Sequence, residues 1–108
     1  MTGFEFVLLG LIKAAVTGAV AGAVIALACL NWDRIVNWFQ SRQWLRLTNP
    51  DAIGFSLRER TANGRFRTAY GVFDTRTGEV MDSEVVSSDT VDSQVEAVHR
   101  GKEMVIYS

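Results

Sequence analysis

The pattern of hydrophobic and polar positions divides the 108-residue chain into an apolar N-terminal segment and a polar remainder. The 25 residues 6–30 contain one charged side chain, Lys13, and residues 14–30 are apolar or small except for the hydroxyl of Thr17. A core helix normally carries a polar stripe, and this segment has none. At about 1.5 Å per residue, 25 helical residues cross the roughly 30 Å hydrocarbon layer of a bilayer. The pattern therefore predicts a transmembrane helix within residues 1–31.

A cleaved signal peptide is the main alternative for this segment, which ends in "ALACL". A signal peptide needs a basic region before its apolar core, whereas "MTGFEF" contains an acid and no lysine or arginine. We therefore expect the segment to be retained. Because arginines follow the segment and none precedes it, the positive-inside rule predicts an outside N-terminus and a cytoplasmic C-terminal domain.

Small residues recur at every fourth position of the apolar segment, namely at Gly10, Ala14, Gly18, Gly22 and Ala26. On a helix these positions share one face, and small-xxx-small stripes let membrane helices pack closely. Such a stripe also arises by chance in a segment so rich in glycine and alanine. We predict that the five residues contact another transmembrane helix, of a second copy or of a different membrane protein.

Residues 32–48 show helical spacing, with Trp32, Ile35, Val36 and Phe39 at i, i+3, i+4 and i+7. One interpretation is a basic amphipathic helix on the membrane surface. The other is that its apolar face packs on the following domain. Because tryptophan favours the headgroup layer and arginine attracts anionic lipid, the first interpretation predicts six anchors to membrane lipid. They are Trp32, Arg34, Trp38, Arg42, Trp44 and Arg46.

The spacing alternates from Ala52 onward and predicts strands over residues 52–60, 65–74 and 79–87. Asn63-Gly64 and Gly78 mark the turns between them. Helical spacing returns from Ser88 or Asp89 to Gly101, and a final strand covers residues 103–108. The order β-β-β-α-β predicts a small α+β domain over residues 49–108, an antiparallel sheet with one helix.

Candidate chemistry is sparse in this sequence. The one histidine, His99, ends a predicted helix, where a surface histidine complements the helix dipole. The one cysteine, Cys29, lies in the apolar segment and can form no internal disulfide. Asp82 and Glu84 alternate on one strand face, which is typical of a solvated face. With no metal-ligand spacing and no phosphate-binding glycine motif, we predict no catalytic residue, cofactor, metal site or small-molecule substrate.

The charge distribution narrows the partner classes. The net charge is −1, and the eight arginines between residues 33 and 76 are scattered, which argues against a nucleic-acid partner. The leading hypothesis is a non-enzymatic single-pass membrane protein, a subunit or accessory factor of a membrane complex with a cytoplasmic protein-interaction module. The alternative is an oligomeric membrane-perturbing effector, toxin-like or holin-like, although the span offers few polar groups to line a pore.

Overall fold

The computed structural model describes residues 7–14 and 24–107. Their strands form one mixed sheet in the order β1-β4-β3-β2-β5, in which β1 runs parallel to β4 and all other neighbours are antiparallel. The strands are β1 Val24–Leu30, β2 Ala52–Arg60, β3 Phe66–Asp74, β4 Glu79–Val91 and β5 Met104–Tyr107. The helices are one over residues 7–14, α2 Trp32–Ser41, α3 Gln43–Thr48 and α4 Ser93–His99.

Glycine turns build the antiparallel part of the sheet, as the sequence indicates. Gly64 has a φ of 84° and closes the β2–β3 hairpin by donating its N–H to the Thr61 carbonyl at 3.0 Å. Gly78 has a φ of 75° and donates to the Asp74 carbonyl at 2.9 Å between β3 and β4. Both positions need the left-handed conformation that glycine adopts without steric cost.

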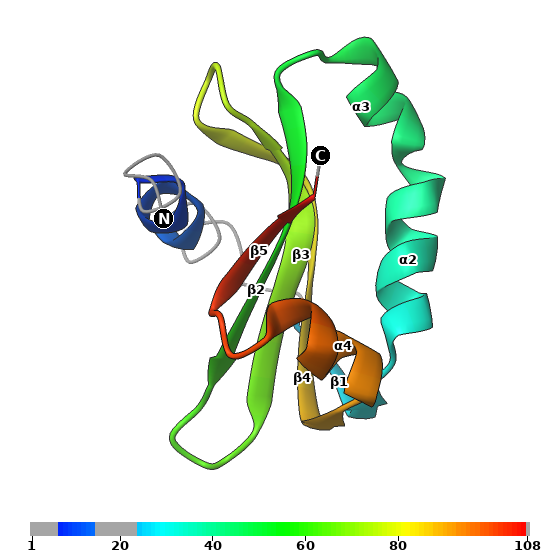
Figure 1. Ribbon diagram of the computed structural model, residues 1–108, viewed down its shortest axis with the longest axis vertical. Helices are drawn as coiled ribbons and strands as arrows, with labels where there is room; N and C mark the ends of the chain where they lie inside the picture. Colours follow the sequence, from blue (N-terminus) through cyan, green and yellow to red (C-terminus); the bar gives the residue numbers. More distant parts are fainter. Residues whose placement is uncertain (1–6, 15–23, 108) are drawn as a thin grey trace.

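Helices cover both faces of the sheet, with α2 and α3 on one side and the helix of residues 7–14 on the other (Figure 1). The core on the α2 side contains Ile35 and Trp38 of α2, packed with Tyr70 and Val86 of the sheet, and includes Val95 of α4. The core on the opposite side is built from buried residues of the first helix, β2, β3 and β4. Its buried members are Leu8, Ile12, Phe55, Leu57, Ala69, Phe73 and Val85.

Two ion pairs fasten α2 to the sheet. The Arg34 guanidinium lies 3.2 Å from the Glu84 carboxylate, and Arg42 Nε lies 2.6 Å from the Asp82 carboxylate. The carboxylates of β4 are therefore partners of the covering helix. The interpretation of Asp82 and Glu84 as a solvated face is wrong, because α2 lies over that face.

Asp92 joins the starts of two helices. One of its oxygens accepts the N–H of Val95 at 2.9 Å in the first turn of α4, and the other accepts the N–H of Trp32 at 2.7 Å at the start of α2. A carboxylate at a helix start satisfies unpaired N–H groups and complements the helix dipole. The sequence predicted the α4 start at Ser88 or Asp89, but β4 continues to Val91.

The structure corrects the predicted membrane architecture. Within residues 7–14 and 24–107, none of the helices combines the length and the apolar character needed to cross a bilayer. The end of the predicted span, Val24–Leu30, is instead strand β1. The predicted single-pass helix is therefore wrong, and so is the topology built on it, with the N-terminus outside and the C-terminal domain cytoplasmic.

The physical reason for this error is an ambiguity of uninterrupted apolar runs. A strand that lies within a sheet can be as continuously apolar as a helix, so periodicity does not separate the two. The predicted purely antiparallel sheet with one helix is wrong for the same reason, because β1 adds a parallel strand and α2 and α3 cover the sheet. The α+β class remains.

Candidate functional site

The predicted helix-interface residues do not form one stripe. Gly10 and Ala14 lie on the exposed side of the first helix, and Ala26 is exposed in strand β1. Gly18 and Gly22 lie outside the described residues. Among the described members of the set, the structure therefore brings together Gly10 and Ala14. Their predicted contact with another transmembrane helix stays a prediction.

The helix of residues 7–14 is apolar on both sides. Its inner side buries Leu8 and Ile12 against the sheet, and the ammonium of Lys13 lies 3.0 Å from the Glu103 carboxylate. Its outer side, here called the outer helix face, is exposed and carries no charged or hydrogen-bonding side chain. It consists of Val7, Gly10, Leu11 and Ala14.

The outer helix face combines large exposed apolar side chains with a glycine that leaves space between them. Val7 is 59% exposed and Leu11 is 46% exposed, and a methyl group added at Gly10 would meet no atom within 4 Å. A surface helix normally turns polar side chains outward. An exposed helix face made only of apolar and small residues is therefore a candidate contact surface.

Most of the predicted lipid anchors have contacts inside the chain. The ring of Trp38 is buried and meets Tyr70 edge-on at 5.6 Å, and the ring of Trp32 lies 6.2 Å from that of Tyr107. Arg34 and Arg42 form the ion pairs described above. Trp44 in α3 is exposed, and Arg46 belongs to the same helix. The structure thus follows the second interpretation of residues 32–48, in which their apolar face packs on the domain.

A buried tyrosine completes the Arg34–Glu84 pair. The Tyr70 hydroxyl donates to Glu84 Oε2, and Arg34 donates to the same carboxylate from Nη2 at 3.2 Å and from Nε at 3.3 Å. Burial, and then the negative charge of Glu84, raise the pKa of Tyr70. The phenol therefore stays protonated and donates to the carboxylate throughout the neutral range.

His99 lies in a buried polar network and not on the surface, so its predicted location is wrong. The backbone carbonyl of Lys102 can only accept, so the hydrogen bond at 3.0 Å places the ring proton on His99 Nδ1. Nε2 then accepts the Ser56 hydroxyl at 2.8 Å, and Ser56 Oγ in turn accepts the Tyr107 hydroxyl at 2.8 Å. The network connects β2, α4 and β5.

A serine donating to a histidine whose other nitrogen is held in place is also the arrangement of an activated nucleophile. Here Ser56 and His99 have no exposed surface, and the Ser56 oxygen is already engaged by two partners. Burial lowers the pKa of His99, and the nearby Arg58 charge lowers it further. The ring is therefore neutral at neutral pH, and the network ties three elements together without exposing an atom to a substrate.

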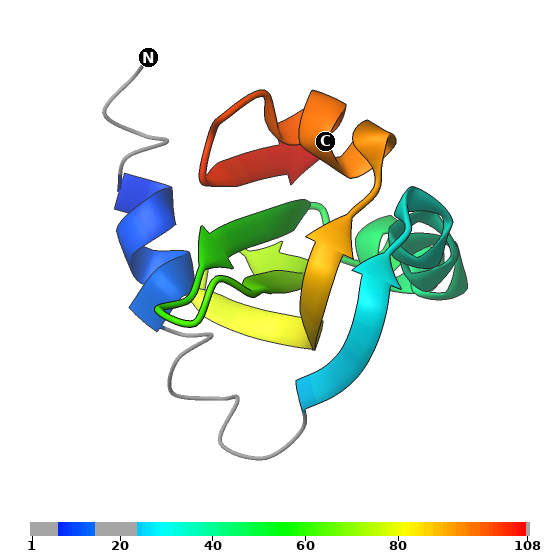
Figure 2. The same cartoon turned by 90° about the horizontal axis from the view of Figure 1, so that it is seen from below.

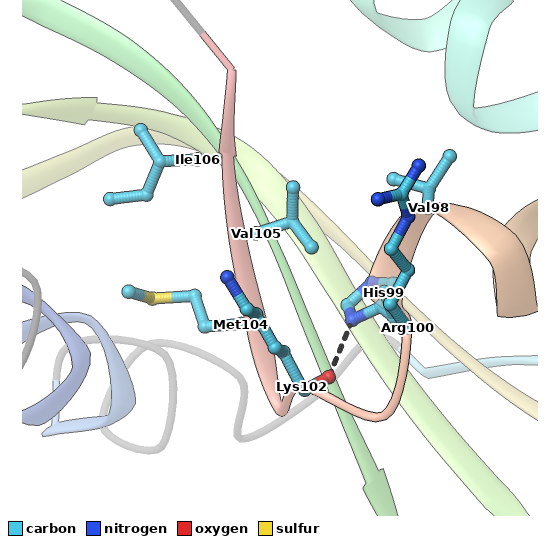
Figure 3. Close-up of a pocket in the computed structure, with 7 residues that line it drawn as sticks. All are labelled: Val98, His99, Arg100, Lys102, Met104, Val105 and Ile106. Carbon is cyan, nitrogen blue, oxygen red and sulfur yellow. Dashed lines mark hydrogen bonds between the residues drawn. The ribbon is translucent and has the colours of Figure 1, made fainter. Parts of the chain in front are cut away.

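A small cavity borders this network at the outer side of β5 (Figure 3). Its volume is about 190 Å³, and Figure 3 shows the His99 ring directed at the Lys102 carbonyl, with Met104 and Ile106 pointing away from the ring. Pockets for small ligands usually measure about 300–1,000 Å³. The cavity is therefore too small for most metabolites.

A wider, open cleft lies between Arg58, Arg60 and Glu96, with a volume of about 630 Å³. Its carboxylates are already paired. Glu96 lies 2.7 Å from Arg58 Nη1, and the two others, Glu59 and Glu103, lie 3.4 and 3.0 Å from basic side chains. Within residues 7–14 and 24–107, no three His, Cys, Asp or Glu side chains are placed to hold a metal ion. Of the basic side chains that line the cleft, Arg58 is paired with Glu96, whereas no ion pair is found for Arg60 or Lys102 among the described residues.

Comparisons with protein-family models, with curated protein sequences and with solved structures found no match for this chain. The outer helix face therefore stands on its own geometry as the candidate functional site.

Proposed function

We propose that this chain is a non-enzymatic subunit or accessory factor that docks onto another protein through the outer helix face. The observation that carries the proposal is that the helix of residues 7–14 is apolar on its outer side as well as on the side packed against the sheet. A surface helix normally turns polar side chains outward, whereas this helix turns Val7 and Leu11 outward. Docking would bury these side chains.

The shape of the face suits a partner helix. Gly10 and Ala14 are one turn apart and lack bulky side chains, so a partner backbone can approach closely between Val7 and Leu11. Burying the exposed halves of Val7 and Leu11 would contribute about 1–2 kcal/mol each to binding.

The experiment places a photo-cross-linking amino acid at position 11 of the full-length chain in its native cell. The matched control carries the same probe at Gln40, which is exposed on α2 at the opposite side of the sheet. We expect one discrete adduct with a different protein from position 11 and none from position 40. Equal adducts from both positions, or an adduct only with a second copy of the chain, would contradict the proposal.

A variant pair checks that the adduct depends on the apolar face. Val7→Glu/Leu11→Glu places two charges in the proposed contact and is expected to remove the adduct from a probe at position 14. Gln40→Glu adds a charge on α2 and is expected to leave it unchanged. Because Val7 and Leu11 are exposed, both variants should keep the wild-type circular dichroism spectrum.

A further inference from the structure

Strand β1 is an edge of the sheet whose backbone is open on one side. In the described part of the chain β1 has β4 as its only strand neighbour, and it lies at the opposite end of the strand order from β5 (Figure 2). The Leu30 carbonyl accepts the Asp92 N–H at 3.0 Å, and the Ala28 carbonyl accepts the Thr90 hydroxyl at 3.4 Å. The even-numbered residues of β1 therefore direct their backbone groups at β4.

The odd-numbered residues of β1 direct theirs outward, because successive residues of a strand alternate between its two sides. Ile25, Leu27 and Cys29 thus direct N–H and C=O groups along the outer edge, where no other described strand pairs with them. Positions 25 and 29 are equally spaced about Leu27. A two-fold axis at Leu27 therefore places each outward-directed residue of one copy opposite an outward-directed residue of a second copy.

β1 lacks the features by which proteins protect an edge strand. It is seven residues long, it contains no charged residue and no proline, and its register with β4 is continuous. Short length, lysine, proline and bulges are the usual protection. The other edge strand, β5, is four residues long and follows Lys102 and Glu103.

We propose that a second copy of this chain pairs with β1 in antiparallel orientation across a two-fold axis at Leu27, joining two sheets into one. Leu27 then faces Leu27 of the partner subunit, and Ile25 faces Cys29 of the partner subunit. Each such pair exchanges two backbone hydrogen bonds. All outward backbone groups of β1 are satisfied in this register.

The side chains and charges fit the same arrangement. On the exposed side of β1, Ala26 lies opposite Ala28 of the partner subunit, so small residues face small residues. The strand carries no charge, so two copies meet without repulsion.

Charged substitutions at positions 26 and 28 of β1 test the proposed strand pairing. We expect light scattering to give twice the chain mass for the full-length protein. Ala26→Lys/Ala28→Lys brings lysines together at two places and is expected to raise the dissociation constant about tenfold. Ala26→Lys/Ala28→Glu carries the same number of charges but pairs opposite signs, and is expected to restore association. A monomeric wild-type chain, or equal masses for the two variants, would overturn the proposal.

Cysteine placement tests the position of the axis. In a Cys29→Ser background, Leu27→Cys puts two thiols in one hydrogen-bonded pair with Cα atoms about 5.5 Å apart, within disulfide range. Ala26→Cys in the same background separates them by about 7–8 Å or more. We expect a covalent dimer on mild oxidation of the first variant and little from the second. Equal cross-linking of both would refute the two-fold axis at Leu27. The outcome is independent of the outer helix face, which the Val7→Glu/Leu11→Glu variant tests separately.

Discussion

Replacing Ser56 with alanine tests the buried polar network that connects β2, α4 and β5. The substitution removes one oxygen that donates to His99 Nε2 and accepts from the Tyr107 hydroxyl, both at 2.8 Å. Alanine keeps the backbone and the Cβ, so packing changes little. The loss of stability therefore measures the hydrogen bonds and the burial of the partners left behind.

The magnitude follows from the burial of those partners. Each hydrogen bond contributes about 0.5–1.5 kcal/mol net, and a buried group left without a partner costs about 1–3 kcal/mol. His99 has no exposed surface, so water cannot replace the serine there, whereas Tyr107 is partly exposed. We expect Ser56→Ala to lower the free energy of unfolding by about 2–4 kcal/mol.

Ser88 supplies the matched control. It has no exposed surface either, but its hydroxyl has no hydrogen-bond partner among the described residues. Removing an unsatisfied buried hydroxyl relieves a desolvation cost, so Ser88→Ala should be neutral or stabilising. Ser56 and Ser88 are equally buried, but replacing them with alanine is expected to change stability differently. The difference between the two changes in stability therefore measures the contribution of the network.

Urea unfolding followed by tryptophan fluorescence measures both variants. With a slope of about 1–3 kcal/mol per molar urea, Ser56→Ala should lower the midpoint by roughly 1–2 M at an unchanged slope. A loss below about 0.5 kcal/mol would refute the network's role in stability, because changes of that size are typical of surface sites. Equal losses for Ser56→Ala and Ser88→Ala would refute it as well, since burial alone would then account for the effect.

Three further predictions follow from the same contacts. Burial lowers the pKa of His99 below its ordinary 6.5, so the free energy of unfolding should be full above pH 6.5 and fall as the pH drops toward the lower folded pKa. In His99→Gln, the free energy of unfolding should depend less on pH when urea unfolding is measured between pH 7.5 and 5.5. Gly71→Ala would place a methyl 2.5 Å from the Asp82 carbonyl oxygen, so calorimetry should show a loss of about 1–3 kcal/mol in the free energy of unfolding. Gly10→Ala places its methyl where no atom lies within 4 Å and should show no such loss. Asp92→Ala removes the carboxylate that accepts N–H groups at the starts of α2 and α4, and urea unfolding should show a loss of about 1–3 kcal/mol in the free energy of unfolding. Asp92→Asn should retain part of that stability.

The hairpins could be predicted from the sequence because their signals are local. Alternating apolar positions define the faces of β2 and β3, and Gly64 and Gly78 occupy turn positions that require a positive φ. Strand β1 could not be predicted in this way. Its partner β4 lies some sixty residues later in the chain, and periodicity does not separate an apolar strand from part of an apolar helix.

The buried network was missed because a single strand does not reveal what covers its second face. In the β2 pattern, Ser56 alternates with Phe55 and Leu57, which is typical of a strand whose second face is polar and turned outward. In the structure α2 and α4 cover that face, which buries Ser56, His99 and the polar positions of neighbouring strands. A run of small hydroxyl residues at those positions, rather than long charged ones, was the available signal: Ser56, Thr68 and Ser88.

The apolar character of the N-terminal segment has a different cause from the one its composition suggests. In the first helix, Leu8 and Ile12 face the sheet while Val7 and Leu11 face outward, so both sides need burial. In β1 the side chains at Ile25 and Leu27 pack on the α2 core, while the backbone edge is open. Lipid would bury such a segment evenly on all sides. In the described part of this segment, the exposed apolar side chains lie on one helix face and on one side of β1, and two separate protein contacts would account for them.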